Sequence, residues 1–393
     1  MDKKSSPSFL GKSLLLLWLS HIILDFFTGI WPIYKTMMHM DIAKAGLVVG
    51  VTGFIAEILQ FGFGYYCDKG YRKGILITGL ILGSSILFIT FTGSLGESFF
   101  VLLLLMLGSS AFHPAAVGYA GMLSKHHKGK TILLFASGGA IGLGISQLVF
   151  TYTLGQMGGH ATILYVPAVL VMLLVLTHRF PKSSIEEGPR TKEALLSPLL
   201  EKKRSFLFLY LIQVTNCAVV MSFVFLLPDI LLSKTKESWV YLGGGHMCFI
   251  LGSALALPIL GYLCDKIGQR KVLITMTLSS FILLYIFLQM ENPSLLAAMG
   301  ILTLLGGCLH SINPIVVSWG HKLAPGSPSI VSGLLMGFAW CLTNFGPTCS
   351  GFLCRYFTEN AVTKSISCMS LLLIASLVFV LCMPKEEAVK VPA

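Results

Sequence analysis

Twelve runs of about 20 mostly apolar residues follow one another along the chain, and each is long enough to cross the hydrocarbon core of a bilayer as a helix. Hydrophobic residues make up 55% of the 393 residues and charged residues only 11%, which leaves too little polar surface for a soluble protein. The runs are roughly residues 13–34, 46–67, 74–92, 98–123, 131–153, 161–178, 206–232, 239–263, 272–290, 294–319, 329–353 and 365–383. The sequence therefore predicts an all-α polytopic membrane protein with twelve transmembrane helices.

The positions of Lys and Arg between these runs predict the orientation. If the N-terminus is cytoplasmic, 22 of the 28 basic residues fall in cytoplasmic segments and 6 in outer segments, with Lys35 among the latter and none deep in a span. An excess of basic residues is typical of cytoplasmic loops. We therefore expect both termini in the cytoplasm, and we interpret the net charge of +11 as contact with anionic lipids, because the bases form no nucleic-acid-binding face.

An internal duplication divides the chain. The segment "GYYCDKGYRKG" (64–74) recurs as "GYLCDKIGQRK" (261–271), and "FHPAAV" (112–117) recurs as "INPIVV" (312–317). Pro32 and Pro228 stand at matching positions near the ends of two spans. We therefore predict two six-helix bundles, residues 1–180 and 205–393, joined by a polar cytoplasmic linker at 181–204. Two parallel six-helix halves are typical of secondary transporters, whose substrate sites lie between the halves near the membrane midplane.

The repeated charged segment resembles the loop signature of the major facilitator superfamily. The second copy matches in register at Gly261, Asp265, Lys266, Gly268, Arg270 and Lys271. The first copy supplies Gly64, Asp68, Lys69, Arg72 and Lys73, but its Gly70 and its basic pair come one residue early, which indicates a deletion. The resemblance implies that these loops latch neighbouring helix ends and release them during transport. The alternative is that the bases only anchor the loops in the cytoplasm.

A narrower resemblance covers the first half. The segments "SHIILDFFTGIWP" (20–32), "ILQ" (58–60) and "GSSAFHPAA" (108–116) resemble the fosmidomycin-resistance branch of the same superfamily. This resemblance implies a bacterial cytoplasmic membrane protein that exports a drug.

Polar residues inside the apolar runs are the candidate site, because titratable groups are costly at membrane depth. Their positions place Asp25, Glu57 and His113 at roughly one depth, around one predicted cavity. The first half supplies the titratable members and the second half only neutral ones. The whole set is His21, Asp25, Glu57, Gln60, His113, Gln213, Asn216 and Asn313.

Structural explanations stay open for several of these residues. His21 and Asp25 lie one turn apart, so they can pair and merely lock the first helix. His113 can hydrogen-bond the carbonyl that Pro114 leaves free. Glu57 is not expected from the family resemblance, which has a small polar residue there. Asp229, near the end of its span, is interpreted as interfacial.

The leading functional hypothesis is a proton-coupled secondary transporter that moves a small amphiphilic or anionic compound by alternating access, as an exporter and antiporter. The alternatives are a metabolite importer with the same fold and a receptor or channel that does not transport. No nucleophile–base set or nucleotide-binding motif indicates an enzyme. The ten cysteines have no metal-type or disulfide-type spacing. We therefore expect no cofactor, no metal and no nucleic acid; the expected partners of a monomeric protein are a small-molecule substrate, protons and lipids.

Overall fold

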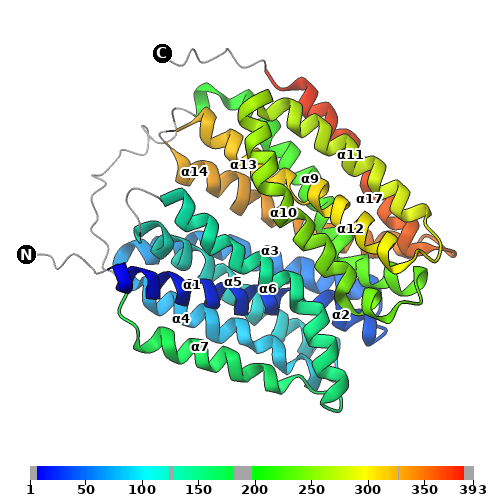
Figure 1. Cartoon of the computed structure of the whole chain (residues 1–393), viewed down its shortest axis with the longest axis horizontal. Helices are drawn as coiled ribbons and strands as arrows, with labels where there is room; N and C mark the ends of the chain where they lie inside the picture. The colour runs from blue at the N-terminus through cyan, green and yellow to red at the C-terminus, as the bar shows by residue number, and fades with distance from the viewer. Residues whose placement is uncertain (1–6, 124–127, 181–196, 198, 326, 385–393) are drawn as a thin grey trace, which may run out of the picture.

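The computed structural model shows an all-helical protein (Figure 1). It describes residues 7–123, 128–180, 197, 199–325 and 327–384, and no strand occurs among them. The predicted linker at 181–204 therefore lies mostly outside the described residues. Each apolar run forms a helix because backbone groups in lipid must be hydrogen-bonded within their own segment.

The helices of the N-terminal half, residues 7–180, include several spans built from two pieces. Span 1 combines α1 with α2, span 3 combines α4 with η2, and span 6 combines η3 with α7. The elements are α1 (Pro7–Thr28), α2 (Ile30–Met37), α3 (Ile42–Tyr66), η1 (Cys67–Tyr71), α4 (Arg72–Gly83), η2 (Ser84–Phe91), α5 (Leu95–Met122), α6 (Lys128–Gln156), η3 (Thr162–Leu164) and α7 (Tyr165–Thr177).

The C-terminal half, residues 199–384, repeats the pattern. Its tenth span is interrupted between α12 and α13, and its eleventh is divided into four pieces. The elements are α9 (Lys203–Lys234), η4 (Val240–Gly244), α10 (Gly245–Ile267), α11 (Gln269–Gln289), α12 (Leu295–Leu309), α13 (Ile312–Leu323), α14 (Pro328–Ser332), η5 (Gly333–Phe338), α15 (Ala339–Thr343), α16 (Phe345–Cys354) and α17 (Ala361–Cys382).

Among the described residues, eleven helical segments are long and apolar enough to cross a membrane. The predicted span at 161–178 corresponds to a shorter apolar helix, Thr162–Thr177. The predicted all-α polytopic fold is confirmed, with the sixth span as its shortest. The first span extends beyond its predicted end at residue 34, because α2 continues to Met37.

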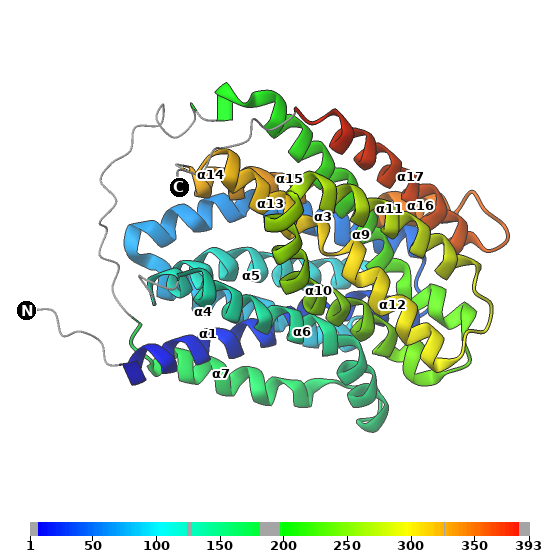
Figure 2. The ribbon, with the colours of Figure 1, turned by 45° about the horizontal axis from the view of Figure 1, so that its top comes forward.

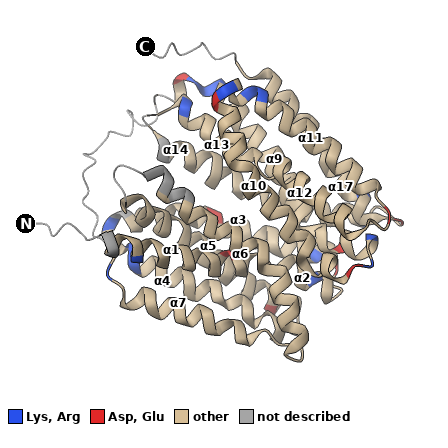
Figure 3. Ribbon diagram, in the orientation of Figure 1, with Lys and Arg blue, Asp and Glu red and all other residues tan. Residues whose placement is uncertain are grey.

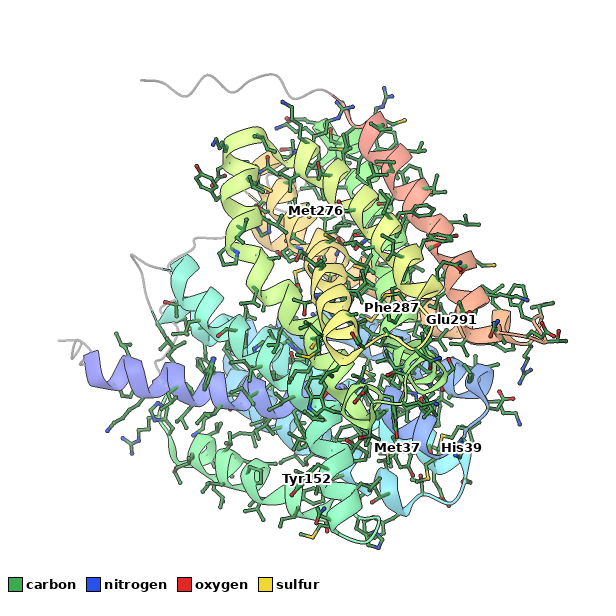
Figure 4. All side chains as sticks on the ribbon, turned by 45° about the vertical axis from the view of Figure 1, so that its right-hand side comes forward. Met37, His39, Tyr152, Met276, Phe287 and Glu291 are labelled. Atoms are coloured by element: carbon green, nitrogen blue, oxygen red, sulfur yellow. The ribbon has the colours of Figure 1, made fainter. Side chains whose placement is uncertain are left out.

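The ends of the spans gather at two faces of the molecule. We call the end that holds residues 7, 177, 203 and 382 the terminal face, and the end with the turns at 38–41, 235–239, 290–294 and 355–360 the loop face. Met37, His39 and Glu291 lie at the loop face, whereas Met276 lies nearer the terminal face (Figure 4). Basic residues concentrate near the two ends, and charged positions are sparse along the helices between them (Figure 3).

Three pairs of spans join the two halves. Helix α3 packs along α15 and α16, α6 packs against η4 and α10, and α2 packs against α9. Figure 2 shows α3 lying beside α15 and α16 of the other half. Three glycines one helical turn apart, Gly46, Gly50 and Gly53, form the contact surface of α3. A Cβ on any of them would overlap Pro347, Thr348 or Asn344. Close approach of the halves therefore depends on the missing side chains.

Asp41 strengthens this junction at the loop face. Its carboxylate caps α3 by accepting the backbone N–H of Lys44 at 2.8 Å, and Arg355 of the other half donates to it at 3.1 Å. The N–H of Lys44 lowers the pKa of Asp41, and Arg355 adds to the effect. The carboxylate therefore keeps both contacts at neutral pH. It loses them only when the pH falls through its lowered pKa.

Replacement of Gly46 by Leu should destabilise this arrangement, because the new side chain would overlap the backbone of Pro347. Overpacking of this kind costs about 1–3 kcal/mol. Thermal unfolding of the purified protein in detergent measures the loss. Gly62→Leu is the matched control, since Gly62 lies in the same helix and has open space where a Cβ would be. Equal melting temperatures for the two variants would contradict the glycine contact.

Candidate functional site

The carboxylate of Asp25 lies between two imidazoles. His21 is one turn earlier on α1, and its Nε2 is 3.2 Å from one oxygen of Asp25. His113, on α5, places its Nε2 3.5 Å from the other oxygen. His21 is buried, while 18% of the Asp25 side chain and 33% of the His113 side chain are exposed. The structure thus brings together three of the residues selected from the sequence, and the group is reachable from its His113 side.

Backbone carbonyls hold both imidazoles in this orientation. The Nδ1 of His21 donates to the carbonyl of Phe135 at 2.9 Å, and the ring stacks on that of Phe135 with centroids 4.2 Å apart. The Nδ1 of His113 donates to the carbonyl of Ser109 at 2.8 Å. Because a carbonyl only accepts hydrogen bonds, each Nδ1 carries a proton, and each Nε2 is left to face Asp25.

Two alternatives drawn from the sequence can now be compared with this geometry. Pro114 lacks an N–H and therefore frees the carbonyl of Ser110, whereas His113 bonds the preceding carbonyl, that of Ser109. The explanation through the proline is wrong. His21 does pair with Asp25, but the same carboxylate also contacts His113 on another helix. The predicted pair within α1 is therefore present, and it is also part of an interhelical group.

Helix α6 closes the group from a third side. Gly139 lies so close that a Cβ there would overlap both His21 and Asp25. The neighbouring Gly138 abuts Trp18, whose Nε1 donates to the hydroxyl of Ser137 at 3.1 Å. Gly138 and Gly139 of α6 thus allow close helix packing.

The donor atoms of His21, Asp25 and His113 all lie within 4.8 Å of one another, and this is the one such group of potential metal ligands among the described residues. The carboxylate already contacts both imidazoles directly. Each Nε2 can donate to the carboxylate when it carries a proton, so protonation of the imidazoles accounts for both contacts without a further ion.

Glu57 and Gln60 lie on the adjacent face of α3. Glu57 is partly exposed and close enough to His113 for their charges to interact. It also lies close enough to Cys341 of α15, in the other half, for its charge to act there. Gln60 is partly exposed one turn further along. Glu57 therefore lies at the seam between the halves, beside the Asp25 group and not within it.

The C-terminal half contributes neutral amides from α9 and α13. The Nε2 of Gln213 donates to the Oδ1 of Asn313, and the Nδ2 of Asn216 lies 3.5 Å from the carbonyl of Leu309. Gln213 and Asn216 are fully buried, yet the side-chain oxygen of each has no hydrogen-bond partner. Buried acceptors without partners are costly, so these two oxygens point to a missing donor.

An ion pair joins the halves near the loop face, and it corrects two predictions. Lys35 was placed in an outer loop, but it is fully buried within α2, where its ammonium bonds the carboxylate of Asp229 on α9. Asp229 also accepts from the Thr36 hydroxyl at 2.9 Å, so it is a bonded junction residue and not merely interfacial. The ring of Phe225 lies 4.6 Å from the ammonium. A signal was present in the sequence: charges of opposite sign follow the matched prolines Pro32 and Pro228.

The two copies of the charged loop make parallel contacts. Lys69 lies over the ring of Tyr65, and Lys266 lies over that of Tyr262. Gly70 and Gly268 both have positive φ, 98° and 87°, so each turns the chain where a side chain would be strained. The glycines Gly64 and Gly261 have no crowded neighbours.

Each loop also caps the last helix of its own half. Lys73 donates to the carbonyls of Leu176 and His178, and Arg270 donates to that of Leu381. Lys73 thus occupies the role of Arg270 although it is the second base of its pair, which offsets the deletion in the first copy. Asp265 pairs with Lys322 at 3.0 Å. The side chain of Asp68 lies outside the described residues, and Arg72 and Lys271 lie in the first turns of α4 and α11.

This geometry defines a multi-pass helical membrane transporter, with polar groups at mid-depth between two packed halves. The sequence model of the Major Facilitator Superfamily matches residues 14–247 and 238–393, and the chain belongs to this family. As a member of a family of transporters, it is a transporter and not an enzyme.

Its curated relatives are distant but extend over most of the chain. It is 24% identical over 386 residues to the fosmidomycin resistance protein of Escherichia coli (strain K12), covering 94% of this chain and 92% of that protein. It is also 24% identical over 357 residues to YfnC, an uncharacterized MFS-type transporter of Bacillus subtilis (strain 168), covering 86% of each.

Solved structures share the fold at lower identity. A bacterial homolog of the human lysosomal transporter Spinster, in an inward-facing and unoccupied conformation, is similar with a TM-score of 0.73 at 15% identity, covering 97% of each chain. The nucleoside transporter NupG is similar with a TM-score of 0.72 at 14% identity, covering 95% of this chain and 98% of that chain. At these identities the likeness concerns the fold alone.

Removal of one partner from the Lys35–Asp229 pair should destabilise the protein strongly. Lys35→Met leaves the carboxylate of Asp229 at the junction without its cation, and breaking a buried pair costs about 3–5 kcal/mol. The double variant Lys35→Met/Asp229→Leu removes both charges and should recover most of the loss. Thermal unfolding of the three proteins measures the coupling. Additive losses in the double variant would show that the two charges do not stabilise each other.

Proposed function

We propose that the protein is a proton-coupled secondary transporter that exports a small amphiphilic compound by alternating access, with both termini in the cytoplasm. The observation that carries the proposal is the carboxylate of Asp25, held between His21 and His113 at mid-depth and partly exposed. A carboxylate in lipid must be paired or protonated. With two imidazoles beside it, the group can hold a proton, and its net charge changes by one when that proton is taken up or released.

The contacts between the halves support alternating access. Several hydrogen bonds and ion pairs cross the junction in the middle and loop-face portions of the spans. Thr151 donates to Leu242, and His246 donates to Leu143. In this conformation the two halves are therefore joined by polar contacts near the loop face. Opening at that face would break these bonds, and a change in the charge of the Asp25 group can bias the equilibrium between the two conformations.

Export is proposed from the resistance named for the Escherichia coli relative. The cytoplasmic placement of the terminal face is proposed from the 22-to-6 distribution of basic residues. In that orientation the protein is closed on the outer side. The cytoplasmic loops then hold the inner helix ends through Asp265, Arg270 and Lys73, and their release accompanies closure of the inner side.

Asp25→Asn should abolish the coupling of transport to protons, because an amide cannot carry one. Substrate-driven pH change in proteoliposomes is the measurement, with exchange of substrate at equal pH retained. Glu359→Gln is the control, since Glu359 is an exposed acid in the loop after α16. An undiminished proton signal in Asp25→Asn, beside a lowered melting temperature, would show that Asp25 has only a structural role.

Asp265→Asn should slow transport while the melting temperature changes little. Asp265 and Lys322 are 77% and 50% exposed, so their pair contributes only about 0–1 kcal/mol to stability. A role in gating instead affects the rate of conformational cycling. Initial transport rates, normalised to the amount of protein in the membrane, test this against Glu359→Gln, an exposed acid in the loop after α16. Full-rate transport by Asp265→Asn would contradict a gating role for this acid.

A further inference from the structure

The packing of α3 against the eleventh span determines what Glu57 faces. Gly53 abuts Asn344, and Phe61 lies against Gly337. The two segments run in opposite directions, so Glu57, one turn after Gly53, lies level with Trp340, one turn before Asn344. Glu57 is close enough to Cys341 for its charge to act on that thiol, which agrees with this register. An acid of one half therefore lies at the same level as an indole of the other.

Groups from four spans share this depth. Glu57 and His113 lie nine residues before the ends of α3 and α5, and Gln213 lies ten residues after the start of α9. Trp340 lies ten residues after the start of the eleventh span at Ile330. Each of these four helix ends lies at the terminal face. At 1.5 Å per residue the four side chains are all about 15 Å from it.

The hydrogen-bonding groups at this level lack donors. Among the described residues, no side chain donates a hydrogen bond to the Glu57 carboxylate. The Oε1 of Gln213 and the Oδ1 of Asn216 also have no partner, although both residues are fully buried. The nearby bases are already engaged, since His113 contacts Asp25 and the buried Lys35 is bonded to Asp229. These acceptors at the seam are therefore available to a ligand that carries hydrogen-bond donors and a positive charge.

Aromatic rings surround the same level. Phe54 and Phe345 meet across the seam with centroids 5.3 Å apart, and Tyr210 stacks on Phe338 at 5.9 Å. Phe61 is 51% exposed, and the Nε1 of Trp340 has no hydrogen-bond partner. Aromatic faces attract cations and receive flat apolar bodies. A carboxylate among rings is suited to an aromatic cation.

We propose that Glu57 and the facing wall of the C-terminal half bind an organic cation with an aromatic body and N–H donors. The carboxylate pairs with the positive charge, Gln213 and Asn216 accept the donors, and Trp340 and Phe61 contact the rings. This inference rests on the proposed transport function and names the substrate class. It favours a cation over the anionic alternative, because an anion would meet the Glu57 carboxylate, and the base at this level, His113, already contacts Asp25.

Equilibrium binding to the purified full chain in detergent tests the proposal. The probes are ethidium, a fluorescent aromatic cation with amino groups, and anilinonaphthalene sulfonate, an aromatic anion of comparable size. We expect ethidium to bind and Glu57→Gln to weaken it by about tenfold or more, the loss of a charge-assisted contact. Glu57→Asp keeps the charge and should retain most of the affinity. Glu97→Gln, an acid in the first turn of α5 at the loop face, should change nothing.

The outcomes separate this proposal from the proposed function. Equal ethidium affinity in Glu57→Gln and the unchanged protein would overturn the cation site, as would tighter binding of the anion or no binding of ethidium. Binding at equilibrium needs no proton gradient, so these results leave proton coupling through Asp25 standing. Conversely, Asp25→Asn with undiminished coupling would overturn the function while leaving the binding result intact. Melting curves of both Glu57 variants confirm that the comparison is made on folded protein.

Discussion

The ion pair between Lys35 and Asp229 is the interaction on which the observed conformation depends. An ammonium without water around it is stable only beside a carboxylate, and here the partner comes from the other half of the chain. The two halves are therefore held together near the loop face by a bond that neither can satisfy alone. The glycines of α3 complete the junction, because they let Asn344, Pro347 and Thr348 approach the backbone.

The same cost of charge in lipid explains why the two halves differ chemically. In the N-terminal half, Asp25 is balanced by two imidazoles whose orientation is set by backbone carbonyls. In the C-terminal half, the amides of Gln213, Asn216 and Asn313 lie near the corresponding depth, and two of their oxygens are left without donors. We interpret the polar groups of the N-terminal half as the place where protons are held. We interpret those of the C-terminal half as a surface that recognises substrate. Glu57 stands between them, at the seam.

The duplication is preserved in contacts even where its sequence has drifted. Both loops place a lysine over a tyrosine ring and turn at a glycine with positive φ. The basic residue that caps the last helix is Lys73 in one copy and Arg270 in the other, although the two differ in their position within the basic pair. The requirement is for a cation at the free carbonyls of a helix end, and a one-residue deletion leaves that requirement intact.

The sequence by itself determined the all-helical membrane fold and the choice of His21, Asp25 and His113, because apolar length and the cost of intramembrane charge are local properties. Tertiary structure decided which groups meet. The contact of His113 with Asp25, the pairing of Lys35 with Asp229 and the level shared by Glu57 and Trp340 each join residues far apart in the chain. A span prediction gives depth along a helix axis, whereas partners depend on how helices rotate and pack. For that reason the sequence assigned Lys35 to a loop, whereas the structure shows it buried at the junction of the two halves.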